Sequence, residues 1–175
     1  VIYYYPYFAK LRKNNVFLLK QIKNSIFAGM KIRLTKEFKF EMSHALDEYQ
    51  GLCRNLHGHS YRLFVTIIGE YVKNPQDNSS GMVLDFKSIK NLVEQNIIQD
   101  FDHAVVLHKN SRFTNVLKQS DTKMIIFENQ PTCENLIIEF HNRIVKSLPV
   151  GIKLAKLKLY ETETSFAEWL MEDNE

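Results

Sequence analysis

Three of the six histidines lie within sixteen residues of one another, at His44, His57 and His59. Side chains at positions i and i+2 of a strand face the same side, so His57 and His59 could bind one ion. His44 ends a preceding stretch with an apolar face and could supply a third imidazole if the two strands pair. Three neutral imidazoles with one open coordination position are typical of catalytic rather than structural zinc. The alternative is that His-Gly-His forms a turn with solvated side chains.

Two groups near these histidines could move protons. Cys53 lies four residues before His57, and a nearby cation makes a thiol a usable base or nucleophile. Its alternative role is that of a small buried hydrophobic residue, which is how we interpret Cys133. Asp102 directly precedes His103, and a carboxylate can orient and charge an imidazole in a proton relay. Side chains adjacent in sequence rarely touch, so the sequence alone does not predict a direct contact between the two.

Glu161 follows Leu157 and Leu159 at the same parity, on the apolar face of its predicted strand. An unpaired carboxylate buried there would be strongly destabilising, so we expect a partner for it. A ligand with two parallel N–H donors, such as the guanidine-like edge of a heterocycle, would compensate the charge by a bidentate hydrogen bond. The alternative is an exposed glutamate at the end of a strand.

A sheet is needed to bring these residues together. From Met30 onward, apolar residues occupy even positions, which predicts a strand with one buried face that includes His44. The apolar positions are Ile32, Leu34, Phe38, Phe40 and Met42, and Lys36 is the exception. A second strand is predicted from about 57 to 69. Its shared face consists of His57, His59, Tyr61, Leu63, Val65 and Ile67.

Two helices and two further strands complete the prediction. Asp85 and Thr132 are expected to cap the helices, which carry apolar residues at helical spacing. A third strand is predicted to end at Glu161, and a short fourth strand closes the chain. Residues 104–131 show little pattern apart from some strand character at 124–127. The order ββααββ predicts an α+β fold, with a four-stranded antiparallel sheet and two helices on one face. Oligomerisation would cover the two open edges of such a sheet.

The composition is that of one soluble globular domain. The chain has 175 residues, of which 45% are hydrophobic and 25% charged. These values exclude intrinsic disorder, a fibrous repeat and a coiled coil, and no apolar run reaches the roughly 18 residues of a membrane span. Two cysteines cannot form a disulfide framework, and we expect them to be reduced thiols in a cytoplasmic protein.

The first 29 residues differ from the rest. They contain five Lys or Arg residues and no Asp or Glu, so residues 30–175 are mildly acidic and have no electrostatic footprint for nucleic acid. A targeting peptide, a membrane-surface helix and a start assigned too far upstream are the alternatives. Targeting peptides have an apolar core of about 7–15 residues or an Arg- and Ser-rich amphipathic stretch, and neither is present. We therefore favour the misassigned start, with Met30 as the first residue and 30–175 as the single domain.

Taken together, the motifs resemble those of the 6-pyruvoyltetrahydropterin synthase / 6-carboxytetrahydropterin synthase family. They are His44, Cys53-x3-His57-Gly58-His59, Asp102-His103, Pro131-Thr132-Cys133-Glu134-Asn135 and Tyr160-Glu161-Thr162. The resemblance covers residues 30–175 in order, and its combination of motifs is specific although each piece alone is not. It implies the T-fold (tunnelling fold), usually a hexamer of two stacked trimers with sites at subunit interfaces.

The resemblance also implies a role for each motif. It implies Zn²⁺ on the three histidines His44, His57 and His59, and a proton-transfer set made of Cys53, Asp102 and His103. It implies that Glu161 anchors the pterin ring, with Thr132 and Glu134 as further candidates for substrate binding.

Spacing points to one branch of that family. The three-residue gap between Cys53 and His57, and the tail from Glu161 to Trp169, look like the bacterial 6-carboxytetrahydropterin synthases of queuosine biosynthesis. The resemblance implies a zinc-dependent lyase that converts 7,8-dihydroneopterin triphosphate to 6-carboxy-5,6,7,8-tetrahydropterin, with release of acetaldehyde and triphosphate. One alternative is a pyruvoyl-forming synthase that keeps the side chain. The other is a non-catalytic pterin-binding protein, against which the intact cysteine and Asp-His pair argue.

Overall fold

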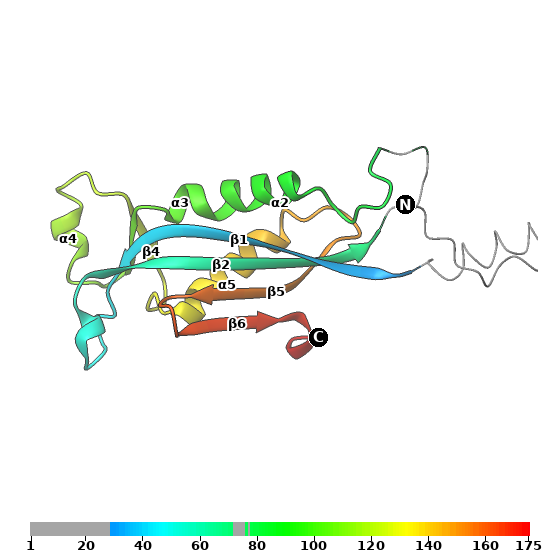
Figure 1. Ribbon diagram of the computed structural model, residues 1–175. Helices are drawn as coiled ribbons and strands as arrows, with labels where there is room; N and C mark the ends of the chain where they lie inside the picture. The colour runs from blue at the N-terminus through cyan, green and yellow to red at the C-terminus, as the bar shows by residue number, and fades with distance from the viewer. Residues whose placement is uncertain (1–28, 72–75, 77) are drawn as a thin grey trace, which may run out of the picture. The chain divides into compact units, whose positions relative to one another are not determined.

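The computed structural model describes residues 29–71, 76 and 78–175, which form a curved six-stranded sheet in the order β4-β3-β1-β2-β5-β6 (Figure 1). The strands are β1 (Lys31–His44), β2 (His57–Glu70), β3 (Ala104–His108), β4 (Met124–Phe127), β5 (Lys153–Tyr160) and β6 (Phe166–Leu170). The helices are α2 (Phe86–Val93), the π-helical turn η4 (Glu94–Ile98), α3 (Gln99–Phe101), α4 (Thr114–Leu117) and α5 (Cys133–Val145). Short 3-10 turns are η3 (Leu52–Arg54) and η5 (Met171–Asp173). The expectations for residues 1–28 lie outside the described residues.

β1 and β2 form a long antiparallel pair. It runs from Lys31 opposite Glu70 to His44 opposite His57. The predicted alternation is confirmed, because the shared faces of the two strands are buried over most of their length. The buried members are Phe38, Phe40, Met42 and His44 on β1, and Tyr61, Leu63, Val65 and Ile67 on β2. The histidines therefore lie where the core face of this pair reaches the end of the sheet.

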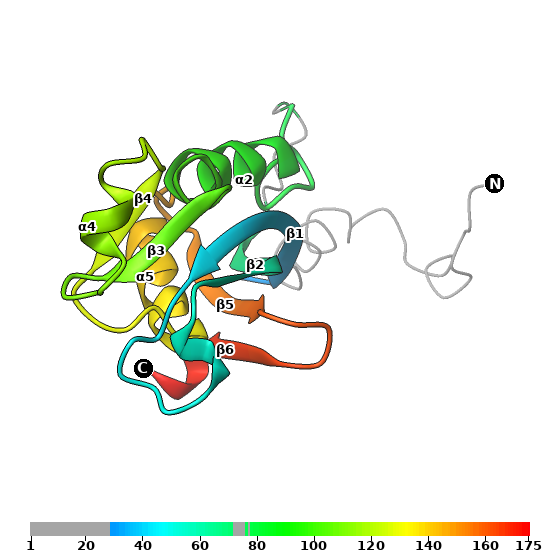
Figure 2. The same ribbon diagram turned by 90° about the vertical axis from the view of Figure 1, so that its left-hand side faces the viewer.

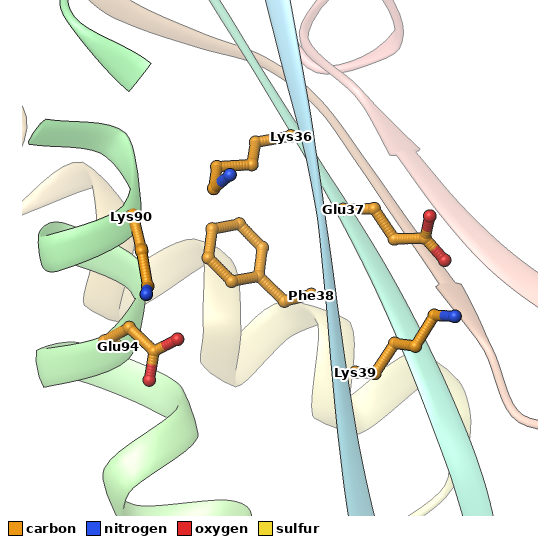
Figure 3. Close-up of a pocket in the computed structure, with 6 residues that line it drawn as sticks. All are labelled: Lys36, Glu37, Phe38, Lys39, Lys90 and Glu94. Carbon is orange, nitrogen blue, oxygen red and sulfur yellow. The ribbon is translucent and has the colours of Figure 1, made fainter. Parts of the chain in front are cut away.

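Lys36, the exception in the β1 pattern, lies beside a small pocket at the edge of the core. The pocket has a volume of about 240 Å³ and is lined by Lys36, Glu37, Phe38, Lys39, Lys90 and Glu94. Figure 3 shows the side chains of Lys36, Lys90 and Glu94 around the ring of Phe38. Lys36 is only half-buried at this edge, so a lysine is tolerated on the strand face that otherwise packs into the core. Phe38 is six residues from His44 along β1, a separation of roughly 20 Å at the rise of an extended strand.

The two longest helices, α2 and α5, pack on one face of the sheet, as predicted (Figure 2). Both predicted caps are present: the Asp85 carboxylate accepts a hydrogen bond from the Lys87 N–H, and the Thr132 hydroxyl accepts one from the Asn135 N–H. The core between helices and sheet is closed by aromatic side chains. Phe140 of α5 contacts Phe40 and Phe101 edge-on, and Phe40 stacks on Tyr61. No helix among the described residues is long and apolar enough to cross a membrane.

The prediction of a four-stranded antiparallel sheet is wrong, because the sheet of the described residues has six strands and is mixed. The two additional strands, β3 and β4, come from residues 104–131, and β4 coincides with the weak strand signal at 124–127. β3 pairs parallel with β1, and β4 pairs parallel with β3. The connection from β2 to β3 consists of α2, η4 and α3. It runs back along the sheet in the direction of β1, so β3 pairs parallel with β1.

Candidate active site

The three predicted metal ligands converge at the end of the β1–β2 pair. His44 lies directly opposite His57, and His59 follows two residues later on the same face. The ring centroids are 4.6 Å apart for His44 and His57, 5.3 Å for His44 and His59, and 4.9 Å for His57 and His59. One nitrogen from each ring lies within 4.8 Å of the other two. The alternative of a solvated His-Gly-His turn is therefore wrong.

Backbone carbonyls fix the orientation of two of the rings. The Nδ1–H of His44 donates to the Pro131 carbonyl at 2.7 Å, and the Nδ1–H of His57 donates to the Asn55 carbonyl at 2.8 Å. A carbonyl oxygen only accepts, so Nδ1 carries the proton and Nε2 keeps its lone pair. This is how outer contacts usually orient metal-binding imidazoles. The buried Nε2 atoms of His44 and His59 have no hydrogen-bond partner among the described residues, as expected of atoms that bind a metal ion.

Burial favours the neutral form of His44 and His59, which is the form that binds metals. Desolvation lowers the pKa of His44, and the charges of His57 and His59 act in the same direction, against the hydrogen bond to Pro131 and the attraction of Glu161. Desolvation also lowers the pKa of His59, for which Glu161 acts in the opposite sense. A neutral imidazole is the ligand species, so the site is prepared for a cation at neutral pH.

Gly58 lets the two strands approach at the histidines. A Cβ atom on Gly58 would lie 2.9 Å from the Ser43 hydroxyl and 3.2 Å from the Met42 carbonyl oxygen. A side chain at this position would require the Ser43 hydroxyl to move and the backbone near Met42 to shift slightly. The glycine between the two histidines is thus explained by packing.

Glu161 lies beside the histidine cluster, at the end of β5. Its carboxylate Oε1 is 3.6 Å from His44 Nε2 and accepts a hydrogen bond of 3.3 Å from the Tyr61 hydroxyl. The side chain is 27% exposed and therefore partly buried, which does not agree with the alternative of an exposed strand-end glutamate. Burial, reinforced by Glu161, raises the pKa of Tyr61, which therefore stays a neutral hydrogen-bond donor. The carboxylate is thus held beside the cluster through contacts of its Oε1.

Asp102 and His103 do touch, although they are neighbours in sequence. The Asp102 Oδ1 is 3.0 Å from His103 Nδ1 and also accepts a hydrogen bond from the Glu41 N–H at 3.0 Å. Burial opposes ionisation of Asp102, but the Glu41 N–H, His103 and Lys123 together lower its pKa. His103 has a φ of 59°, a left-handed conformation that few residues with a side chain adopt. This backbone turns the imidazole back onto its own neighbour.

A cavity lies beside the Asp-His pair at the end of the β1–β2 pair. It has a volume of about 290 Å³ and lies between β1, β2 and the start of β3. Its lining consists of Glu41, Met42, Ser43, Gly58, His59, His103, Ala104 and Val105. A predicted metal ligand, His59, and a predicted proton-transfer group, His103, are both among the residues that line it.

The remaining candidates are Cys53, Thr132 and Glu134. Cys53 is on η3, in the loop that joins the two histidine-bearing strands, and is half-buried. Within the part of the chain that the structure describes, its thiol makes no hydrogen bond or ion pair. Thr132 follows Pro131, whose carbonyl holds His44, whereas Glu134 is exposed on the first turn of α5.

Cys133 has the structural role predicted for it. Its thiol donates to the Leu159 carbonyl, and burial raises its pKa to about 12. A thiol with such a pKa is not ionised at neutral pH, so Cys133 is inert there.

A model of the family described as 6-pyruvoyl tetrahydropterin synthase matches residues 33–172. The chain belongs to the 6-pyruvoyl tetrahydropterin synthase family. It is 33% identical over 141 residues to the 6-carboxy-5,6,7,8-tetrahydropterin synthase of Haemophilus influenzae, covering 78% of this chain and 97% of that protein. It is also 33% identical over 165 residues to the Aquifex aeolicus protein of the same name, covering 80% and 98%. These relatives are named as synthases, which confirms that the chain is an enzyme of this family.

Solved structures confirm the fold of the 6-pyruvoyl tetrahydropterin synthase family. The Caenorhabditis elegans 6-pyruvoyl tetrahydropterin synthase superposes with a TM-score of 0.58 at 22% identity, covering 81% of this chain and 96% of that one. An uncharacterized protein from Wolinella succinogenes superposes with a TM-score of 0.67 at 17% identity, covering 82% and 99%. At these identities the likeness concerns the fold alone.

Two contacts of this family member were missed in the sequence. Tyr61 shares the face of His57 and His59, and that parity could have indicated its contact with Glu161. Lys123 donates to the carbonyls of Gln99 and Asp102 at the end of α3, and thereby holds the backbone that presents the Asp-His pair. No motif indicates it, because Lys123 lies in the stretch where the sequence shows little pattern.

Proposed function

We propose that this protein is a zinc-dependent 6-carboxy-5,6,7,8-tetrahydropterin synthase. The reaction converts 7,8-dihydroneopterin triphosphate and water to 6-carboxy-5,6,7,8-tetrahydropterin, acetaldehyde and triphosphate. The observation that carries the proposal is the convergence of His44, His57 and His59, in a chain 33% identical to several proteins of that name. The neighbouring Glu161 and Asp-His pair support it.

The three histidines would hold the ion through Nε2. The chemistry of the donor set fits zinc, since imidazoles suit this ion and three protein ligands leave a position for substrate. When bound, zinc supplies Lewis acidity that polarises oxygens of the substrate's hydroxylated side chain. The Pro131 and Asn55 carbonyls keep His44 and His57 in the ligating tautomer.

Glu161 anchors the pterin ring in this proposal. Both of its contacts in the structure use Oε1, with Tyr61 and His44, so Oε2 can accept from an N–H of the ring. The 2-amino group and the adjacent ring N–H of a pterin are parallel donors that match a carboxylate. Thr132 and Glu134 are the further substrate-binding candidates, and the position of Thr132 next to Pro131 supports its role more than the exposure of Glu134 does.

Cys53 and His103 move the protons. Asp102 orients the His103 ring through the contact between its Oδ1 and His103 Nδ1, and His103 and His59 line the same cavity. Removal of acidified C–H and O–H protons leads to elimination of triphosphate, and a retro-aldol-like step then releases the terminal carbons as acetaldehyde. Cys53, on the loop between the histidine strands, is the second proton-transfer group.

The test is to incubate zinc-loaded protein with 7,8-dihydroneopterin triphosphate and to identify the products. We expect one acetaldehyde and one triphosphate per 6-carboxytetrahydropterin by mass spectrometry. Cys53→Ala should lower kcat by about 10²–10⁴ while substrate still binds, since that is the usual contribution of a positioned proton-transfer group. The matched control is Cys133→Ala, which removes the partly buried, inert thiol and should retain turnover. Absence of triphosphate release by the wild type would overturn the proposal.

The same experiment separates the alternatives. The family description and the Caenorhabditis elegans structure carry the name 6-pyruvoyl tetrahydropterin synthase, an activity that eliminates triphosphate and keeps the side chain. That activity would give a product with an intact three-carbon side chain and no acetaldehyde. A non-catalytic pterin-binding protein would bind the substrate without releasing triphosphate.

We also propose the assembly and pathway that the family resemblance implies. The assembly is a homohexamer of two stacked trimers, and the pathway is queuosine biosynthesis. The open outer strands β4 and β6 support an assembly, because association would pair their free edges. Light scattering of the purified protein gives its mass, and a monomer at micromolar concentration would contradict the hexamer.

A further inference from the structure

Arg112 connects two segments that are far apart in sequence. One is the loop 45–56, which joins β1 to β2 and carries Cys53. The other is the turn between β3 and α4, in the stretch where the sequence shows little pattern. Both lie at the same end of the sheet (Figure 1). The Nη2 of Arg112 donates to the Arg54 carbonyl at 2.7 Å, and Arg54 is the residue after Cys53.

The same guanidinium also contacts the other end of that loop. Arg112 Nε is 3.4 Å from Asp47 Oδ1, and its guanidinium carbon lies 4.7 Å from the centre of the Phe113 ring. The stacking on Phe113 restricts the side chain in the orientation that reaches both partners. Arg112 thus contacts the loop at two points, Asp47 near the end of β1 and Arg54 in η3. The planar fork of an arginine suits such a two-point contact, which a lysine cannot reproduce.

The Asp47 carboxylate needs this cation. Its side chain is 13% exposed, and neither oxygen has a hydrogen-bond partner among the described residues. A buried carboxylate whose charge has no partner is unfavourable, so we expect Asp47 to stay buried only while it is paired with Arg112. Within the loop, the Leu46 N–H donates to the Cys53 carbonyl at 2.9 Å. Release of Asp47 would therefore disturb the backbone that is directly bonded to Cys53.

We infer that Arg112 is a positioning residue that fixes the conformation of the loop carrying Cys53, the proposed proton-transfer group. It acts through the Arg54 carbonyl and the Asp47 carboxylate and needs no contact with substrate. The inference rests on the proposed function for its effect on turnover. Its effect on the loop itself is independent of any activity.

The test compares Arg112→Ala with two other variants in the full chain loaded with zinc. Hydrogen exchange followed by mass spectrometry reports the loop 45–56, and steady-state kinetics report kcat and KM. We expect exchange in the loop to become about tenfold faster, while the strands β2 and β5 keep their protection. We expect kcat to fall about tenfold or more, with zinc content unchanged and KM within about twofold.

Arg112→Lys should give intermediate loop exchange and kcat, because an ammonium can neutralise Asp47 but cannot also bond the Arg54 carbonyl in the same geometry. The matched control is Lys109→Ala, which removes an exposed cation paired with Glu128 from the same connection. This variant should leave loop exchange and kcat unchanged. If Arg112→Ala does not fold, Arg112→Gln replaces it, since the amide keeps a donor for the carbonyl and loses only the charge and the fork.

Loop exchange and kcat unchanged in a folded Arg112→Ala protein would overturn the inference. Faster exchange with unchanged kcat would also overturn it, since Arg112 would then be structural alone. If the wild type does not convert 7,8-dihydroneopterin triphosphate, the proposed function fails. Loop exchange and the rate of Cys53 alkylation by iodoacetamide then decide about Arg112, with faster alkylation in Arg112→Ala supporting the inference and an unchanged rate refuting it.

Discussion

Replacement of Glu161 by glutamine isolates the binding of the pterin ring from the chemistry of its side chain. The substitution keeps the volume of the side chain but removes its charge and turns one acceptor oxygen into an NH₂ donor. That donor would face the donors of the ring. A hydrogen bond to a charged group is worth about 1.5–3 kcal/mol, so the affinity for a pterin should fall by roughly 10- to 150-fold. This energy range applies because the Glu161 side chain is 27% exposed and thus partly desolvated.

The metal site should survive this change. Glu161 attracts the protonated form of His44 and so acts against the burial that lowers the pKa of that histidine. Its neutralisation lets the pKa of His44 fall further, which keeps the imidazole neutral and able to bind zinc. Zinc content of Glu161→Gln should therefore equal that of the wild type. A loss of pterin affinity cannot then be ascribed to a lost ion.

The assay is calorimetric titration of both proteins with a pterin that has no triphosphate side chain and does not react. The matched control is Glu168→Gln, because Glu168 is also 27% exposed but is paired with Lys156 on β5. The affinity of this control for the pterin should be within about twofold of the wild-type affinity, because Glu168 is not expected to contact the ligand. Equal affinity of wild type and Glu161→Gln would show that Glu161 does not anchor the pterin ring.

Three further predictions concern the metal, pH and the first residues of the chain. His57→Ala should lose zinc by elemental analysis and lose activity while keeping its circular dichroism spectrum, since one of three ligands is gone; full zinc occupancy would contradict the site. Metal-free protein should lose stability as pH falls below about 6.5. Folding lowers the pKa values of His44 and His59 from 6.5, so the unfolded chain binds more protons in this range. Urea unfolding at pH 7.5 and 5.5 measures this difference, and equal stability at the two pH values would contradict it. A chain that begins at Met30 should keep the activity and melting temperature of the full chain, and a large drop in melting temperature would show that residues 1–29 contribute to the packed structure.

The sequence predicts the part of the fold in which periodicity is long and regular. Alternation over β1 and β2 indicated which face of each strand is buried, and strand parity then placed His44, His57 and His59 together. The caps at Asp85 and Thr132 were predictable because their side chains bond locally. Each of these signals depends on residues close together in sequence.

The missed features depend on contacts across long stretches of chain. β3 has the sequence Ala-Val-Val-Leu-His, which is too short and too uniformly apolar to show alternation. The contact of Asp102 with His103 depends on a left-handed backbone at His103, which the residue type permits but does not require. The bond from Arg112 to the Arg54 carbonyl joins residues 58 positions apart, and no local pattern marks either of them. Such features become visible only when the sheet has brought the segments together.

The most direct test of the account is X-ray absorption at the zinc edge of the zinc-loaded wild-type protein. The geometry of His44, His57 and His59 predicts three imidazole nitrogens around the ion, with oxygen from water completing the shell and no sulfur. It also predicts that a substrate-like pterin replaces the water oxygen and leaves the three nitrogens in place. A sulfur neighbour would make Cys53 a ligand instead of a proton-transfer group, and a fourth nitrogen would close the position that the proposed reaction requires. Either result would contradict a three-histidine catalytic centre.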